Sequence, residues 1–174
     1  MKAILRLSTT ETMRFTFYIG LPGCGKTTLM RVILNEFRMV EADEMVVEGS
    51  IKYHKFEKQK TLVLGIYDES TFAGTDRLSK SCPPKFREWL TDNAEKYEGW
   101  NVYLEGERFM NGKTLDALFQ QEEMNLVCLQ VSEAELERRR KARNNTQDPK
   151  WMKGMRTRVE NVCKNYPHSI EVIG

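Results

Sequence analysis

The chain has 174 residues, the size of one compact domain with a core of its own. Hydrophobic residues are 40% of the chain and charged residues 30%, a globular balance that excludes disorder as the default. No apolar run approaches the ~18 residues that a membrane span needs, so no membrane partner is expected. The formal net charge of +2 does not by itself indicate a nucleic-acid partner.

The chain reads as a single domain over residues 1–174. Residues 1–12 lack the apolar core and cleavage site of a signal peptide and are expected to form a short extension. The cysteines match no metal-binding spacing, and free thiols in a reducing cytoplasm are the expected state. They are Cys24, Cys82, Cys128 and Cys163.

A glycine-rich loop follows the first predicted strand, Arg14–Ile19, and precedes a helix predicted from Lys26 to about Phe37. The loop reads GLPGCGKTT and satisfies G-x-x-x-x-G-K-[ST] in the strand-to-helix context that supports a phosphate-binding loop. Its glycines let successive N–H groups turn inward toward an anion, and the helix N-terminus adds its dipole. The loop is therefore predicted to bind the phosphates of a nucleoside triphosphate.

Each residue of this loop is a predicted nucleotide ligand. They are Gly20, Leu21, Pro22, Gly23, Cys24, Gly25, Lys26, Thr27 and Thr28. Lys26 brings a positive charge to the β- and γ-phosphates, and the Thr27 hydroxyl can ligate Mg²⁺. ATP and Mg²⁺ are thus the expected cofactors, with the choice between ATP and GTP left open by the motif.

The following segment reads as a helix, a hairpin and a strand. The expected apolar stripe of the helix is Leu29, Val32, Ile33 and Phe37. Met45–Val47 and Ile51–Phe56 look extended around Gly49-Ser50, which predicts a β-hairpin insertion. Thr61–Tyr67 is a nearly continuous apolar run, typical of a strand that is buried on both faces.

Helices and strands continue to alternate in the second half of the chain. A helix is expected from Pro83-Pro84 to Gly99, with Phe86, Trp89, Leu90 and Tyr97 as its apolar stripe. A strand at Asn101–Leu104, a brief helix around Leu115–Phe119 and a strand at Leu126–Val131 follow. Ser132 and Glu135 form a capping box, and a polar break at Asn144–Asp148 precedes the last helix. That helix has Trp151, Met155, Val159 and Val162 on one side, and Ile170–Ile173 is the expected closing strand.

Acidic residues stand at the ends of two of these strands, where the ligands of parallel α/β sheets bind. Asp68 follows the Thr61–Tyr67 run, and Glu105 follows Asn101–Leu104. We prefer Glu105 as the acid that holds Mg²⁺, directly or through water, because Gly106 allows a close approach. The alternative for each acid is a solvated strand end.

The loop after Asp68 contains the sequence Gly-Thr-Asp76-Arg77. Either Asp76 or Asp68 is expected to accept the proton of an acceptor hydroxyl, and Asp43 is a third candidate. Arg77 is expected to clamp a phosphate or to stack on a base. The alternative is a turn in which Asp76 only satisfies backbone N–H groups.

Nine Lys or Arg residues and one acid lie between Arg138 and Arg158. We expect residues 132–160 to form a lid and basic helical region that supplies arginines to the transferring phosphoryl group. Arg139 and Arg143, four residues apart, should share one helix face and act there. The alternatives are a solvated basic face and a nucleic-acid groove in which Trp151 stacks on bases.

Together these features predict a P-loop NTPase-like three-layer α/β sandwich with a mostly parallel five-stranded sheet and helices on both faces. Four blocks resemble the 5-hydroxymethyluracil DNA kinases of thymidine-hypermodifying phages. They are GLPGCGKTTLMR at 20–31, LGIYDESTFAGTDRLS at 64–79, YLEGERF at 103–109 and RRRKARNNTQDPKWMKGMRTRVEN at 138–161.

This resemblance implies transfer of the γ-phosphate of ATP to the hydroxymethyl group of a modified pyrimidine in DNA, which makes DNA the expected partner. It implies work in the host cytoplasm if the chain is phage-encoded. Two alternatives stay open: a kinase of free nucleosides or nucleotides, and a P-loop hydrolase or nucleotide switch. A GTPase is disfavoured, because no Asn-Lys-x-Asp guanine-binding motif follows a late strand. The oligomeric state is also open.

Overall fold

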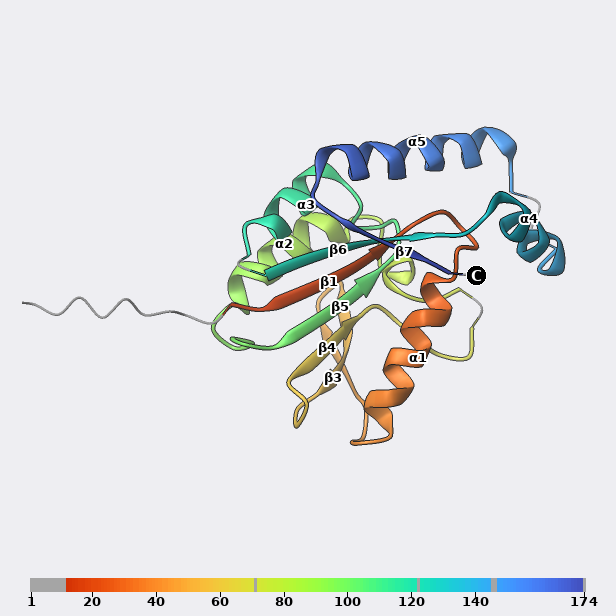
Figure 1. Cartoon of the computed structure of the whole chain (residues 1–174). Helices are drawn as coiled ribbons and strands as arrows, with labels where there is room; N and C mark the ends of the chain where they lie inside the picture. Colours follow the sequence, from red (N-terminus) through yellow and green to blue (C-terminus); the bar gives the residue numbers. More distant parts are fainter. Residues whose placement is uncertain (1–11, 71, 122, 145–146, 174) are drawn as a thin grey trace, which may run out of the picture.

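The computed structural model describes residues 12–70, 72–121, 123–144 and 147–173 (Figure 1). All but the last residue of the expected extension at 1–12 lie outside these ranges. The strands are β1 (Arg14–Ile19), β2 (Glu44–Glu48), β3 (Ile51–Phe56), β4 (Thr61–Leu64), β5 (Asn101–Glu105), β6 (Glu123–Gln130) and β7 (Ser169–Val172). The helices are α1 (Lys26–Arg38), η1 (Thr75–Arg77), α2 (Cys82–Asp92), α3 (Gly112–Phe119), α4 (Glu133–Ala142) and α5 (Pro149–Asn165).

The described strands form one seven-stranded sheet in the order β2-β3-β4-β5-β1-β6-β7. Neighbours from β4 to β7 in this order pair in parallel, which confirms the five predicted parallel strands. The predicted hairpin is also confirmed, as β2 and β3, which pair antiparallel. Because β3 pairs with β4, the hairpin extends the same sheet and the total is seven strands rather than five.

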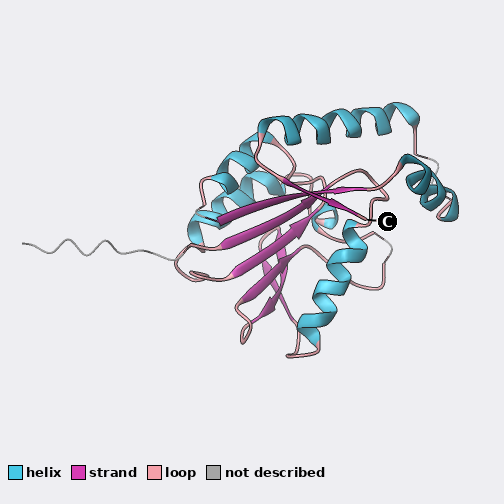
Figure 2. Cartoon of the chain, in the orientation of Figure 1, coloured by secondary structure: helices cyan, strands magenta, loops and turns pink. Residues whose placement is uncertain are grey.

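Helices cover both faces of the sheet (Figures 1 and 2). On one face α1 packs through Met30 and Leu34 against Phe56 and Val63. On the other face α2, α3 and α5 enclose the main core, which includes Phe15, Phe17 and Ile19 of β1. Figure 1 shows α4 beyond the carboxyl end of β6. The three-layer architecture agrees with the predicted fold class.

Four details of the sequence prediction are wrong. β4 ends at Leu64, because the backbone turns at Gly65 (φ 106°) and Ile66 forms only an isolated bridge to Gly74. Helix α2 ends at Asp92, where the Asn93 side chain donates to the Trp89 carbonyl at 3.1 Å and caps the last turn. Tyr97 is therefore buried, but it belongs to the turn after α2 and not to the helix. Val32 and Trp151 do not join their predicted stripes and are 52% and 41% exposed.

Helix α4 opens where the sequence places it, but its capping box is only half formed. The Ser132 hydroxyl accepts from the Glu135 N–H at 3.3 Å, whereas the Glu135 carboxylate turns to Arg138 and Arg139. Helix α5 begins after Asp148, whose carboxylate accepts from the Lys150 N–H at 3.0 Å. Within the predicted break, residues 145–146 lie outside the described part of the chain.

Candidate active site

The loop between β1 and α1 folds back on the side chain of Lys26. Gly20, Gly23 and Gly25 have φ angles of 149°, 88° and 106°, where side chains are disfavoured. A Cβ at Gly20 would lie 2.7 Å from the Leu129 carbonyl oxygen. The Lys26 ammonium is buried and donates to the carbonyls of Gly20 and Leu21 at 2.8 and 3.2 Å. This places one positive charge inside a turn of backbone N–H groups.

The two predicted Mg²⁺ ligands meet beside this loop, although they come from distant parts of the chain. The Thr27 hydroxyl donates to Glu105 Oε1 at 3.1 Å. The Tyr67 hydroxyl donates to the same oxygen at 3.2 Å. A hydroxyl and a carboxylate are the oxygen ligands that Mg²⁺ takes in proteins, so the residues fit this ion.

The Glu105 carboxyl is almost fully buried, and its pKa is raised to about 7, with burial as the largest cause. Within that balance the positive charge of Lys26 lowers the pKa and the Asp76 carboxylate raises it. Gly74 is required next to it, since a Cβ there would lie 2.3 Å from Glu105 Oε1. The surroundings thus keep this carboxyl neutral to a higher pH than a solvated glutamate.

Asp76 lies in η1, directly over the end of β5. Its Oδ1 accepts from the N–H groups of Glu107 and Arg108 at 2.9 and 2.8 Å, as the turn interpretation of this loop predicts. The neighbouring Thr75 hydroxyl donates to the Glu105 carbonyl at 2.6 Å. Asp76 also lines the cavity beside the phosphate loop, and its Oδ2 makes no hydrogen bond to the described residues. Asp76 is therefore available to a bound ligand as well as to the turn.

The other two candidate bases lie away from that cavity. Asp68 forms an ion pair with Arg77, which lowers the pKa of the Asp68 carboxyl. Asp43 accepts from Arg38 at 2.7 Å and pairs with His54. Neither of these acids, nor Arg77, is among the described residues that line the cavity.

The cavity has a volume of about 500 Å³ and opens beside the phosphate loop. It collects charged and aromatic side chains from four regions of the fold. The acidic residues are Asp76, Glu105 and Glu107. The positively charged residues besides Lys26 are Lys80, Arg108, Arg143 and Arg158, and the aromatic residues are Phe72 and Trp151. Phe72 and Trp151 are 59% and 41% exposed, unusually accessible for large apolar rings.

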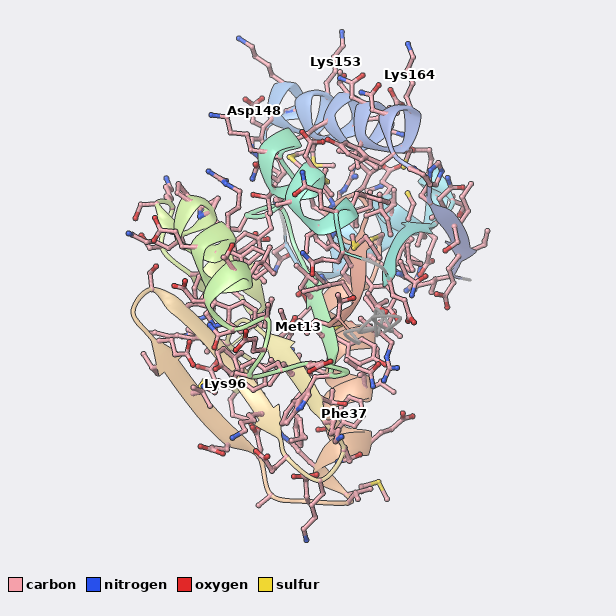
Figure 3. All side chains as sticks on the ribbon, turned by 90° about the vertical axis from the view of Figure 1, so that its left-hand side faces the viewer. Met13, Phe37, Lys96, Asp148, Lys153 and Lys164 are labelled. Carbon is pink, nitrogen blue, oxygen red and sulfur yellow. The ribbon has the colours of Figure 1, made fainter. Side chains whose placement is uncertain are left out.

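The basic segment divides between this cavity and the solvent. Arg143 and Arg158 line the cavity, and Arg158 also donates to the Met110 carbonyl at 2.8 Å. Arg139 packs on the phosphate loop and donates to the Cys24 carbonyl at 3.2 Å. Other basic residues of the segment are exposed: Arg138 and Lys141 pair with glutamates of their own helix, and Lys153 points outward from α5 (Figure 3).

Sequence reasoning did not single out several residues of the site. Arg108 had a usable signal, because it follows the acid at the end of β5 by three positions. Tyr67 closes an apolar run and was read as the end of a strand. Lys80 and Phe72 stand in a loop without periodicity, so no pattern marks them.

The family model described as P-loop Nucleotide Kinase3 matches residues 11–171 of the chain. The chain belongs to this family. The match spans the phosphate loop, the strand-end acid Glu105 and the basic segment, so the protein is a P-loop kinase, a phosphotransferase that uses a nucleoside triphosphate. No curated protein matches the chain. No helix among the described residues of this kinase combines the length and the apolar character that crossing a membrane requires.

Proposed function

We propose that this kinase transfers the γ-phosphate of ATP to the hydroxymethyl group of 5-hydroxymethyluracil in DNA. The observation that carries the proposal is the cavity beside the phosphate loop, where Asp76, several cations and two exposed aromatic rings come together. A pyrimidine acceptor in DNA needs three features. They are a general base near its hydroxyl, cations that contact the phosphates of its strand and aromatic rings that stack on the pyrimidine. The sequence blocks that resemble the phage DNA kinases supply the identity of the acceptor.

In the proposed reaction the phosphate loop binds the triphosphate, and Lys26 turns from the Gly20 carbonyl to the β- and γ-phosphates. Thr27 and Glu105 would hold Mg²⁺, which supplies charge neutralisation at the phosphates when bound. The acceptor oxygen forms a bond to the γ-phosphorus as the bond from that phosphorus to the β–γ bridging oxygen breaks, which releases ADP. The hydroxyl proton passes to Asp76, and Arg139, Arg143 and Arg158 are the candidates for stabilising the transferring phosphoryl group.

The cavity volume of about 500 Å³ is in the usual range of about 300–1,000 Å³ for small-molecule sites. The phosphate loop lines part of it, so the triphosphate takes up some of this volume, and the remainder suits at most one acceptor nucleotide and not a stretch of duplex. A DNA acceptor must therefore present its base outside the helix, at a cost that is lowest for single-stranded or mismatched DNA. We expect transfer to single-stranded DNA to be faster than transfer to the paired duplex.

A second candidate is a kinase of free nucleosides or nucleotides, which the family description "Nucleotide Kinase" and the size of the cavity both favour. The two candidates separate in one assay with labelled γ-phosphate. The acceptors are an oligonucleotide with 5-hydroxymethyluracil, the same oligonucleotide with thymine, and the free nucleosides and nucleoside monophosphates. Label on the modified oligonucleotide alone supports the proposal, and label on free nucleosides alone supports the second candidate. A DNA acceptor should also bind more weakly as salt rises, because released counterions drive its binding.

Asp76→Asn should lower the rate of transfer about 10- to 100-fold with little change in ATP affinity, because the loose transition state needs the base mainly to orient its nucleophile. Asparagine keeps Oδ1 as the acceptor for the Glu107 and Arg108 N–H groups, so the turn should survive. The measurement is kcat together with calorimetric ATP binding. A collapse of ATP affinity would instead place Asp76 in the nucleotide site.

Trp151→Ala should weaken acceptor binding about tenfold while the KM for ATP stays constant, since stacking on one base contributes about 1–3 kcal/mol. Trp151→Phe is the matched control, because it keeps a ring at the same position and should retain most of the affinity. The measurement is the KM for the modified oligonucleotide. An unchanged KM in Trp151→Ala would remove this side chain from the acceptor site.

A further inference from the structure

A line of buried polar contacts connects the β2–β3 hairpin with Glu105. Asp43, just before β2, lies 2.8 Å from Nδ1 of His54 in β3. Nε2 of His54 accepts a hydrogen bond from the backbone N–H of Tyr67 at 3.3 Å. The Tyr67 hydroxyl in turn donates to Glu105 Oε1 at 3.2 Å. The hairpin, which has no part in the cavity lining, thus reaches the phosphate-binding region through one tyrosine.

The partners of His54 define its state. Because Nε2 accepts from the Tyr67 N–H, the ring proton is on Nδ1 and is donated to the Asp43 carboxylate. Burial lowers the pKa of His54, which agrees with a neutral ring. The Asp43 carboxylate is itself held by Arg38 at 2.7 Å. Hydrogen bonds at both ring nitrogens therefore fix the orientation of the imidazole.

The Tyr67 side chain helps to set the direction of the Glu105 carboxylate. Its side chain is only 4% exposed, and its hydroxyl shares Glu105 Oε1 with the Thr27 hydroxyl. A Cβ at Gly74 would lie 3.2 Å from the Tyr67 hydroxyl and 2.3 Å from Glu105 Oε1. Two hydroxyl donors and a glycine thus fix the direction of one carboxylate oxygen. The Tyr67 backbone is the part of this arrangement that His54 holds.

We propose that His54 is a positioning residue: it holds Tyr67 so that the Tyr67 hydroxyl orients the Glu105 carboxylate toward Thr27. This inference rests on the proposed function, because the orientation of Glu105 matters only if phosphate is transferred beside it. It gives the hairpin a role beyond extending the sheet. It also predicts that His54 and the Tyr67 hydroxyl act along one route, so that losing both costs no more than losing either.

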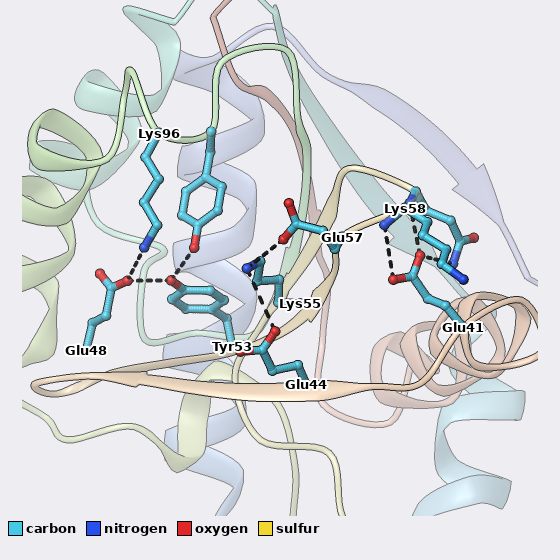
Figure 4. A network of polar contacts seen from close by, with 10 residues as sticks. Glu41, Glu44, Glu48, Tyr53, Lys55, Glu57, Lys58 and Lys96 are labelled. Atoms are coloured by element: carbon cyan, nitrogen blue, oxygen red, sulfur yellow. Dashed lines mark hydrogen bonds and ion pairs between the residues drawn. The ribbon is translucent and has the colours of Figure 1, made fainter.

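The test compares His54→Leu, His54→Gln, Tyr67→Phe and the double variant of His54→Leu with Tyr67→Phe. Leucine fills the space without polar atoms, whereas the amide oxygen of glutamine can accept from the Tyr67 N–H. The matched control is Tyr53→Phe, one residue away on β3. It removes a buried hydroxyl that bonds to Glu48 and Tyr97 at 2.6 and 2.7 Å, in a different network (Figure 4).

Two sets of measurements are made on each folded variant, besides the unfolding temperature. The first is kcat and the KM for ATP in the transfer assay. The second is the Mg²⁺ concentration at which binding of a fluorescent ATP analogue is half-maximal, which does not depend on turnover. His54→Leu and Tyr67→Phe should each lower kcat about tenfold and raise that Mg²⁺ concentration several-fold, with the KM for ATP nearly constant.

His54→Gln should restore most of kcat, Tyr53→Phe should leave it unchanged, and the double variant should match the single variants. The inference is overturned if the losses multiply in the double variant or if Tyr53→Phe is as impaired as Tyr67→Phe. Even if His54→Leu fails to fold, equal values of kcat in Tyr67→Phe and Tyr53→Phe contradict the inference, because the Tyr67 hydroxyl would then have no role beyond that of any buried hydroxyl. A wild-type protein that transfers no phosphate refutes the proposed function instead.

Discussion

Lys26→Ala should lower phosphate transfer about 10³-fold, because it removes the charge that meets the β- and γ-phosphates in the transition state. The Lys26 ammonium is buried against the Gly20 and Leu21 carbonyls and would exchange these partners for the phosphate oxygens of a bound triphosphate. The fold should persist, since the polar contacts of the Lys26 ammonium are to its own loop, at Gly20, Leu21 and Cys24. The measurement is kcat/KM with labelled γ-phosphate.

Lys85→Ala is the matched control, because Lys85 is exposed on α2 and, among the residues that the structure describes, pairs with Glu88 alone, at i, i+3. It should transfer phosphate at the wild-type rate. If Lys26→Ala instead kept the wild-type rate and an unchanged unfolding temperature, the loop would not be the phosphate site.

Glu105→Gln should lower transfer about 10²- to 10³-fold, since it removes the carboxylate expected to hold Mg²⁺ beside Thr27. Glutamine keeps an oxygen that can accept from Thr27 and Tyr67, so the hydrogen-bond geometry of the site should remain. The measurement is kcat at saturating ATP over a series of Mg²⁺ concentrations. Wild-type activity at low Mg²⁺ in Glu105→Gln would exclude Glu105 as a ligand.

The same substitution should change how stability depends on pH. Burial raises the pKa of the Glu105 carboxyl from 4.5 to about 7. Between these two values of pH the folded protein therefore holds a proton that the unfolded chain releases. The resulting contribution to the free energy of unfolding, up to about 3 kcal/mol, is complete below pH 4.5 and is lost as the pH rises through about 7. Glutamine does not ionise, so Glu105→Gln escapes this loss.

With a chelator present and no nucleotide, the free energy of unfolding of Glu105→Gln relative to wild type should thus increase from pH 5 to pH 8. Urea unfolding at the two pH values measures it. A difference that is independent of pH, or that decreases, would contradict the assigned ionisation of Glu105.

Much of the fold is predictable because the local signals agree with one another. The five parallel strands are short β-branched or apolar runs, and most of the helices between them begin at a proline or a polar cap, whereas α1 begins at the glycine-rich loop. Errors arise where tertiary contacts override the pattern. Thr61–Tyr67 reads as one strand, but the close approach of Gly65 to Gly74 ends it at Leu64. Trp151 has helical spacing with Met155 and Val159, yet its ring stays at the cavity.

The candidate site is predictable where covalent spacing or strand ends define it. The loop that contains Lys26 is contiguous, and the topology of a parallel sheet brings Thr27 and Glu105 to the same edge. Asp43, Asp68 and Asp76 could not be ranked from the sequence, because each is an acid beside a predicted strand, helix or loop without a pattern that marks a base; of the three, only Asp76 lines the cavity. The link from His54 to Tyr67 joins a strand to a loop through one backbone N–H, for which no sequence pattern exists.

The most direct test of the account is ³¹P NMR of the protein with ATP, Mg²⁺ and a single-stranded oligonucleotide that contains 5-hydroxymethyluracil. We expect the γ-phosphate signal to fall while a phosphomonoester signal appears that is split into a triplet by the two protons of a methylene group. Growth of inorganic phosphate alone, at a rate that does not depend on the oligonucleotide, would contradict the central claim that this kinase delivers phosphate to a hydroxymethyl acceptor.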